Sequence, residues 1–123
     1  MDTSVWVDHL RRGDKALVSL LNEGEVLCHP FVIGELACGN LQKRAEVLSL
    51  LSALPSAVLA THDEVLLLLS RKRLSGRGLG WVDVHLLASS LLSGTVLWTR
   101  DKALKAAADA MKLGYAPRAD SGL

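Results

Sequence analysis

The sequence has little of several features that narrow a protein's function at once. Aromatic residues make up only 4% of its 123 residues, and the formal net charge is +1. A protein that binds nucleic acid through its overall charge needs a clear basic excess, so any such binding here must come from a local patch or a metal ion. The longest unbroken apolar stretch, residues 65–69, is far shorter than the roughly 20 residues of a membrane-spanning helix. We therefore expect neither bulk electrostatic binding of nucleic acid nor a membrane segment.

Cysteine is also scarce. Cys28 and Cys38 lie ten residues apart, and no cysteine or histidine pattern of the zinc type surrounds them. The chain meets His9, Arg11 and Arg12 before any long apolar run, so no secretory signal peptide is expected. We expect a cytoplasmic protein with two reduced thiols.

Aliphatic residues, and not aromatic residues, supply most of the hydrophobic content of the chain. Half of the chain is hydrophobic, so the core is expected to consist of Leu, Val and Ala. The length fits one domain over residues 1–123, and it is sufficient to bury such a core. The mean hydropathy of +0.27 is high for a small domain and points to apolar surface that a partner covers.

Periodicity, caps and breakers divide the chain into short elements. The patterns predict helices over residues 14–21, 31–37, 43–54, 65–73, 82–92 and 101–113, and short strands over residues 25–28, 57–60 and 95–98. Thr61 and Glu64 match a capping box, and Gly114 is expected at the C′ position of the last helix. Short strands that alternate with helices indicate βαβ units, so the expected fold class is α/β with a parallel sheet. Ligands of such sheets bind at the carboxyl ends of the strands.

Acidic residues stand near the starts of these elements. Asp83 follows a glycine-rich loop, Asp101 comes two residues after Thr99, and Glu35 lies on a short apolar helix. A carboxylate among apolar residues is costly to bury unless it is paired or bound to a metal ion. Each acid taken alone also has a structural explanation. Asp83 and Asp101 suit helix N-termini, Glu35 suits a solvent-exposed face, and Asp2 suits a frayed chain end.

Four segments set these acids in a wider pattern. Residues 2–11, DTSVWVDHLR, resemble the opening motif of PIN-domain proteins, in particular the VapC-type toxin ribonucleases. The second to fourth motifs of that family resemble residues 30–36 (PFVIGEL), 80–88 (GWVDVHLLA) and 97–104 (LWTRDKAL). Any one match is weak, but four in family order span nearly the whole chain and together are specific.

The resemblance implies a fold, an activity and partners. The fold would be a three-layer α/β/α sandwich with a central parallel sheet, usually dimeric. The activity would be Mg²⁺- or Mn²⁺-dependent cleavage of single-stranded or looped RNA by a toxin of a toxin–antitoxin pair, with a VapB-like antitoxin as its second partner. Asp2, Glu35, Asp83 and Asp101 map onto the acidic metal site of the family, and Ser4 and Thr99 onto supporting hydroxyl positions.

Phosphodiester hydrolysis explains why such a site is acidic. It needs an activated water and stabilisation of negative charge, and Mg²⁺ with its hard oxygen ligands supplies both. We expect Asp2 and Asp83 to hold the metal most directly, with Glu35 and Asp101 positioning water or helping to deprotonate it. Without metal the four carboxylates would repel one another and some would take up protons, so activity should fall at acid pH.

The first strand of such a fold is a special case. Residues 1–4 leave no room for a strand ahead of Asp2, so this strand is expected to be truncated. A segment of about four apolar residues placed before Asp2 should then tighten metal binding. Unchanged affinity would show that Ser4 and its neighbours already hold Asp2.

Several other residues have both a functional and a structural interpretation. The basic residues beside the glycine-rich loop contact RNA phosphates or merely form a solvated helix end, and Arg100 contacts substrate or pairs with an acid. These basic residues are Arg71, Lys72, Arg73 and Arg77. The four histidines have no metal-ligand spacing, and the three tryptophans are expected to anchor the core. Surplus apolar positions over residues 66–69 and 86–92 are expected to serve a homodimer and the antitoxin.

Two other readings remain open from the sequence. A non-catalytic PIN-like interaction module would keep the fold and dimer surface but would not bind metal, which an Mg²⁺ titration would test. A phosphatase with an aspartyl nucleophile would need a further Asp two residues after the first, where the chain has Ser4.

Overall fold

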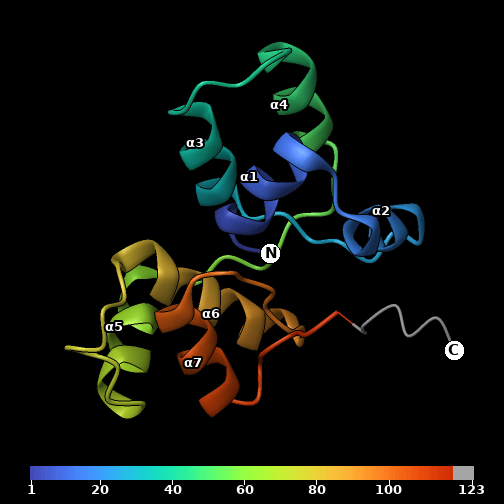
Figure 1. The fold of residues 1–123 in the computed structure, drawn as a ribbon. Helices are drawn as coiled ribbons and strands as arrows, with labels where there is room; N and C mark the ends of the chain where they lie inside the picture. The colour runs from blue at the N-terminus through green and yellow to red at the C-terminus, as the bar shows by residue number, and fades with distance from the viewer. Residues whose placement is uncertain (118–123) are drawn as a thin grey trace, which may run out of the picture.

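Helices dominate the structure, a computed structural model that describes residues 1–117 (Figure 1). In chain order they are α1 (Thr3–Arg12), α2 (Lys15–Asn22), α3 (Pro30–Ala37), α4 (Arg44–Ser52), α5 (His62–Arg71), α6 (Trp81–Ser93) and α7 (Lys102–Ala110). All six helices expected from periodicity are present, with ends that move by a few residues.

Local capping explains why these helices begin where they do. Thr61 Oγ1 accepts a hydrogen bond from the Glu64 N–H at 3.2 Å, and Glu64 Oε1 accepts one from the Thr61 N–H at 2.9 Å, so the predicted capping box is confirmed. Asp14 caps α2 by accepting from the Leu17 N–H at 3.1 Å. Pro30 occupies the first turn of α3, where its missing N–H costs nothing.

Two expectations about helices are corrected. α1 was not expected, although Asp2 stands at its N-cap and Gly13 follows its last residue. The last helix ends at Ala110 rather than at residue 113, so Gly114 is not its C′ residue. Gly114 instead pairs with Leu97 and passes so close to Asp109 that a Cβ atom would collide with the Asp109 carboxylate.

The expected α/β/α sandwich with a central parallel sheet is wrong for this structure. Within residues 1–117 the extended segments form no sheet, only two isolated parallel bridges, Cys28 with Ser56 and Leu97 with Gly114. Four hydrogen bonds of 2.6 to 3.0 Å flank these pairs: Cys28 N–H to the Pro55 carbonyl, Ala57 N–H to the Cys28 carbonyl, Leu97 N–H to the Leu113 carbonyl, and Tyr115 N–H to the Leu97 carbonyl. The segments expected as strands are thus extended but paired over single residues.

A cavity lies between the two bridged pairs. It has a volume of about 390 Å³ and is lined by Met1, by residues 25–27 and by residues 94–98, so it separates the two extended segments. Residues 25–28 and 95–98 therefore have no neighbouring strand on their facing sides, and a continuous ladder of hydrogen bonds cannot form across the gap.

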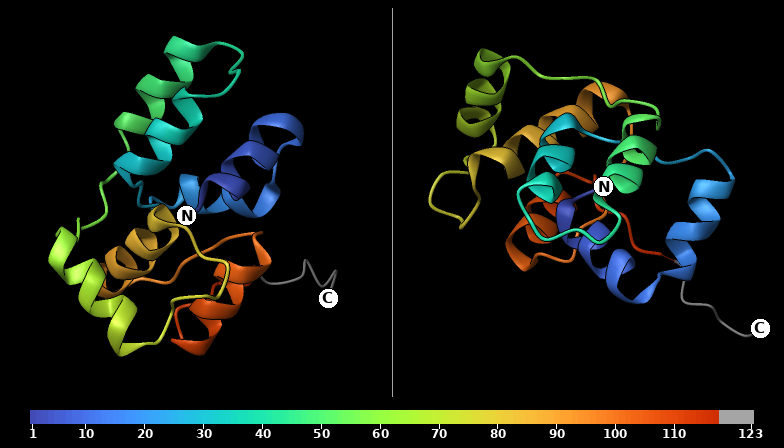
Figure 2. Two further views of the ribbon diagram at one scale, coloured as in Figure 1. Left: turned by 90° about the vertical axis from the view of Figure 1, so that its left-hand side faces the viewer. Right: turned by 90° about the horizontal axis from the view of Figure 1, so that it is seen from above.

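The helices form two groups around one core. α1 packs on α3 and α3 on α4, while α5 packs on α6, and two views show α1 to α4 on one side of the N-terminus and α5 to α7 on the other (Figures 1 and 2). Buried residues from all seven helices belong to a single hydrophobic cluster. α6 is its centre, since residues 84–90 are buried without a break.

The core is aliphatic, as the composition indicated. Leu17, Leu87, Leu97 and Leu104 are among its largest fully buried side chains. Both cysteines are free, as expected, with Cys28 buried and Cys38 exposed. In the part of the chain that the structure describes, no helix is long and apolar enough to cross a membrane.

Candidate metal and nuclease site

Asp2 is held firmly rather than frayed. Only 6% of it is exposed, and its Oδ2 atom accepts hydrogen bonds from the Ser4 and Thr99 hydroxyls, each at 2.7 Å. Its backbone N–H donates to the Trp98 carbonyl at 2.9 Å. Two hydroxyl donors to one oxygen stabilise the ionised carboxylate and fix its orientation.

The same two hydroxyls connect Asp2 to the start of α7. Thr99 Oγ1 accepts from the Asp101 N–H at 3.0 Å, and Ser4 Oγ accepts from the Arg100 N–H at 3.0 Å. The two hydroxyl oxygens lie 3.4 Å apart. Residues 99–101 are thereby tied to the first turn of α1, which brings the first and fourth motifs of the sequence together.

Asp83 stands in the first turn of α6, where it is partly buried. Its Oδ2 atom accepts from the Gly80 N–H at 2.9 Å. Burial raises the pKa of Asp83 above its ordinary value; the Gly80 N–H opposes this, and the charges of Asp2, Asp101 and Glu35 add to it. Asp2, Asp101 and Glu35 are therefore close enough for their charges to act on the Asp83 carboxylate.

Glu35 and Asp101 are more open to solvent than the other two acids. Glu35 Oε1 accepts a hydrogen bond of 2.7 Å from Thr3 Oγ1, which lies 32 residues away on α1. Asp101 is the N-cap of α7 and accepts from the Ala103 N–H at 3.0 Å through Oδ1. Sequence reasoning missed the role of Thr3, although its place between Asp2 and Ser4 in the first motif was a usable signal.

The donor chemistry of these acids suits a hard divalent cation. Within residues 1–117, no group of three or more His, Cys, Asp or Glu side chains is arranged to hold a metal ion jointly. Mg²⁺, however, is commonly held by only one or two carboxylates and fills its remaining positions with water. The residues present therefore fit a cation held by one or two carboxylates, and do not fit a cage of protein ligands.

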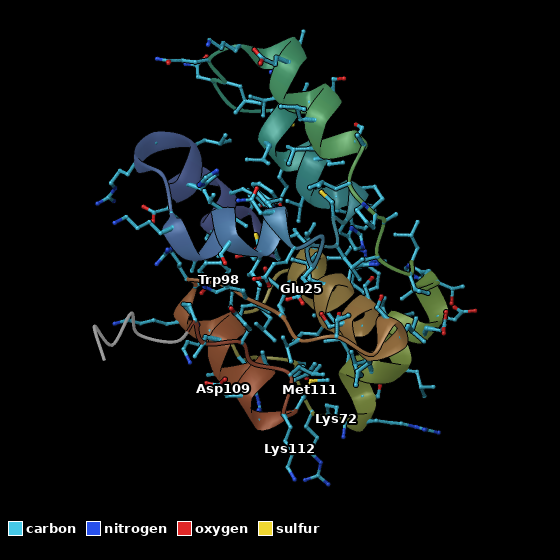
Figure 3. The ribbon with its side chains drawn as sticks, turned by 90° about the vertical axis from the view of Figure 1, so that its right-hand side faces the viewer. Glu25, Lys72, Trp98, Asp109, Met111 and Lys112 are labelled. Atoms are coloured by element: carbon cyan, nitrogen blue, oxygen red, sulfur yellow. The ribbon has the colours of Figure 1, made fainter. Side chains whose placement is uncertain are left out.

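The basic residues suggested for substrate binding lie in different places. Residues 71–73 stand at the end of α5, roughly 15 Å along the helix from His62, and Lys72 lies at the end of the α5–α7 group that points away from α1 to α4 (Figure 3). Arg77 is exposed on the loop that reaches α7, where a Cβ atom on Gly78 would lie 3.7 Å from the Ala103 Cβ atom. Arg77 is thus the member of this set that the loop carries toward Asp101.

Arg100 forms ion pairs with acids that are not among the four carboxylates of the site. Its guanidinium forms ion pairs with Asp14 at 2.6 Å and with Asp8 at 3.2 Å, and it lies 5.8 Å from the ring centroid of Trp98. Of the two alternatives considered for Arg100, pairing with an acid is the one that the structure contains.

His29 stands at the start of α3, where it lines the cavity beside Met1. It is buried, and its Nδ1 atom accepts from the Phe31 N–H at 3.0 Å as the N-cap of α3. Its Nε2 atom finds no hydrogen-bond partner within residues 1–117. Burial, followed by the charges of His85 and the N-terminal amino group, lowers the pKa of His29 to about 4, so the ring is neutral at neutral pH.

Comparison with known proteins relates the chain to a family. The family described as "PIN domain" matches residues 1–110. Ribonuclease VapC32 of Mycobacterium tuberculosis (strain CDC 1551 / Oshkosh) is 56% identical over 108 residues, which cover 87% of this chain and 87% of the relative. The protein of the same name from strain ATCC 25618 / H37Rv gives the same values. No solved structure matches the chain significantly.

Proposed function

The chain belongs to the PIN-domain family, and from this premise we propose its function, that of a VapC-type toxin ribonuclease of a toxin–antitoxin pair. The family resemblance drawn from four short motifs is confirmed. The relatives carry the name ribonuclease and align with most of this chain. The reaction is hydrolysis of RNA phosphodiester bonds, and enzymes of this family depend on a divalent metal ion.

One observation about the site carries the proposal. Burial raises the pKa of Asp83, and the nearby charges of Asp2, Asp101 and Glu35 add to this effect, although the four acids come from four separate segments of the chain. Gathering like charges is unfavourable unless something binds them, so the arrangement is explained by a cationic ligand. Mg²⁺, or Mn²⁺ in its place, suits such a site because Mg²⁺ needs only one or two direct carboxylate ligands and keeps several of its waters.

The roles of the individual residues follow from their contacts. Asp2 and Asp83 would hold the cation, which lowers the pKa of bound water and stabilises charge on phosphoryl oxygens. Ser4 and Thr99 would hold the Asp2 carboxylate in one orientation through their 2.7 Å hydrogen bonds. The more exposed Glu35 and Asp101 are open to water at the rim, where they would orient the attacking water or accept its proton.

Partner surfaces are proposed on the exposed apolar residues of two helices. Leu66 and Leu67 of α5 and Leu91 and Leu92 of α6 are all more than 40% exposed. Surfaces of this kind mark protein interaction sites on small domains. We assign one such surface to a homodimer and another to a VapB-like antitoxin.

An assay on total RNA tests the activity. The purified chain is incubated with RNA in Mg²⁺, in Mn²⁺ or in EDTA, and the cut ends are mapped. We expect cleavage at defined positions with metal and none in EDTA. The Asp83→Asn variant, which retains the side-chain oxygen that accepts from Gly80, should remain folded and lose cleavage.

Two outcomes would contradict the proposal. Cleavage that proceeds equally in EDTA would show that no metal is needed. A folded chain that neither cuts RNA nor binds Mg²⁺ in a calorimetric titration would instead be a non-catalytic interaction module with a PIN-like sequence.

A further inference from the structure

A strip of aromatic rings crosses the starts of three helices. Phe31 of α3 lies 4.8 Å from His85 of α6 between ring centroids, His85 lies 4.9 Å from Trp81, and Trp81 lies 5.0 Å from His62 of α5. We call these four residues the aromatic strip. Residues from separate parts of the sequence form it, so it depends on the fold and not on one segment.

The strip is open to solvent at its large rings. Trp81 is 37% exposed and Phe31 is 40% exposed, whereas His85 between them is buried. The other two tryptophans, Trp6 and Trp98, are only 3% and 5% exposed. The expectation that the tryptophans anchor the core therefore holds for those two and is wrong for Trp81.

The packing within the strip fixes the two exposed rings. His85 meets Phe31 at an interplanar angle of 68° and Trp81 at 82°, which are favourable edge-to-face arrangements. A ring held in this way loses little further freedom when a flat ligand stacks on it.

The strip shares one face of α3 with a carboxylate of the site. Phe31 precedes Glu35 by four residues, so both side chains lie along one face of α3. On α6, Asp83 is two residues from both Trp81 and His85, so it belongs to the same end of the helix but lies on another face. A single-stranded chain whose phosphate reaches the acids would bring a neighbouring unpaired base to these rings, and bases bind aromatic side chains by stacking in a sequence-tolerant way.

We propose that the aromatic strip binds an unpaired base of the RNA substrate beside the scissile phosphate, with Trp81 and Phe31 as its stacking faces. This proposal rests on the proposed function, because it assigns a binding subsite to the same nuclease. It predicts a preference for single strands and loops over duplex RNA, since a paired base cannot leave its stack without cost.

Intrinsic fluorescence tests the proposal with a readout other than activity. The Asp83→Asn chain, which should bind without cutting, is titrated with a single-stranded 12-nucleotide RNA of mixed sequence and with the same RNA as a duplex. Because Trp6 and Trp98 are buried, quenching should come from Trp81. We expect saturable quenching with the single strand and little with the duplex. We expect no quenching when the Asp83→Asn chain also carries Trp81→Phe.

Affinity measured by anisotropy of a labelled single strand separates stacking from apolar burial. Trp81→Phe retains a ring and should bind within about threefold of the parent, whereas Trp81→Leu should lose roughly tenfold or more. Phe31→Leu should also weaken binding. Leu50→Ala is the control, since it trims an exposed apolar side chain of α4 outside the strip and should leave affinity unchanged.

The outcomes separate this proposal from the one on which it rests. If the wild-type chain cuts RNA with metal but Trp81→Leu and Phe31→Leu bind as tightly as the parent, the strip does not contact RNA and serves a protein partner instead. If no variant binds RNA and the wild-type chain does not cut it, both the subsite and the ribonuclease function are overturned.

Discussion

Thr99 and Asp2 are joined by a 2.7 Å hydrogen bond from the threonine hydroxyl to the carboxylate, across 97 residues of sequence. Both side chains are buried. Thr99 also accepts from the Asp101 N–H, so one hydroxyl connects two of the four acids. This contact makes the segment before α7 a structural part of the site and not merely a neighbour of it.

Removing that hydroxyl should loosen the site. In Thr99→Val the shape is nearly kept, but the buried Asp2 carboxylate loses one of its two hydroxyl donors. We expect a loss of roughly 1–3 kcal/mol in the free energy of unfolding, measured with urea. Affinity for Mg²⁺, measured by calorimetry, should fall by about 10- to 100-fold.

Thr99→Ser is the matched control for this change. Serine keeps the hydroxyl and loses a methyl group, so affinity for Mg²⁺ should stay near that of the parent. Equal Mg²⁺ affinity in Thr99→Val and the parent would show that the hydrogen bond does not position Asp2 for metal.

Asp101 and Asp109 allow a charge-matched test on one helix. Asp101→Asn removes a carboxylate of the site but leaves a good N-cap for α7. Asp109→Asn removes the same charge from an exposed pair with Lys105, an interaction that contributes little to stability. We expect cleavage of a labelled RNA to fall at least about tenfold in Asp101→Asn and to be unchanged in Asp109→Asn.

A rate in Asp101→Asn equal to that of the parent would contradict a role for Asp101. A similar fall in both variants would point to the loss of one negative charge as the cause. Melting curves followed by circular dichroism should show that both variants keep the parent's fold.

The helices and the acidic residues could be predicted because their signals are local. The capping box at Thr61 and Glu64 and the proline at the start of α3 depend on residues within one turn. The acids were found by their positions after loops and by the order of the family motifs. Their mutual proximity depends on the fold, yet it was implied by the resemblance alone.

The sheet was predicted wrongly and the aromatic strip was not predicted, because both depend on contacts between distant segments. Short segments such as residues 25–28 become strands only if neighbours pair with them, and beside the cavity at Met1 no strand pairs with this segment within the described residues. Trp81 reads as a core residue from its apolar neighbours, and only the packing of α6 against α5 and α3 decides how much of it is covered.

Acid should destabilise the fold through His29. The pKa of this residue is lowered from 6.5 to about 4 in the folded protein. Between these values the unfolded chain binds the proton more readily, so stability is full above pH 6.5 and is lost as the pH falls toward 4. Since one pKa unit corresponds to about 1.4 kcal/mol, we expect a loss of about 2–3 kcal/mol between pH 7.5 and 4.5, measured by urea unfolding.

His29→Asn separates this residue from the other titrating groups. Asparagine retains an N-cap acceptor for the Phe31 N–H but does not titrate in this range. Its stability should therefore depend less steeply on pH than that of the parent. Identical pH dependence in the two proteins would assign the acid sensitivity to other groups, such as His85, whose pKa burial also lowers.

Filling the cavity beside Met1 should stabilise the protein. The N-terminal amino group is buried there, and burial lowers its pKa because the charged form is poorly solvated. Four valines inserted between Met1 and Asp2 would carry the amino group away and place apolar side chains against Val26 and Leu97, which line the cavity. We expect an increase of about 2 kcal/mol in the free energy of unfolding after the entropy of ordering these residues is subtracted.

Four serines at the same place are the control and should give no increase, because they bury little apolar surface. Mg²⁺ affinity separates the two effects of the insertion: tighter binding in the valine variant would show that the cavity weakens the hold on Asp2, whereas a rise in stability alone would show that Ser4 and Thr99 already suffice.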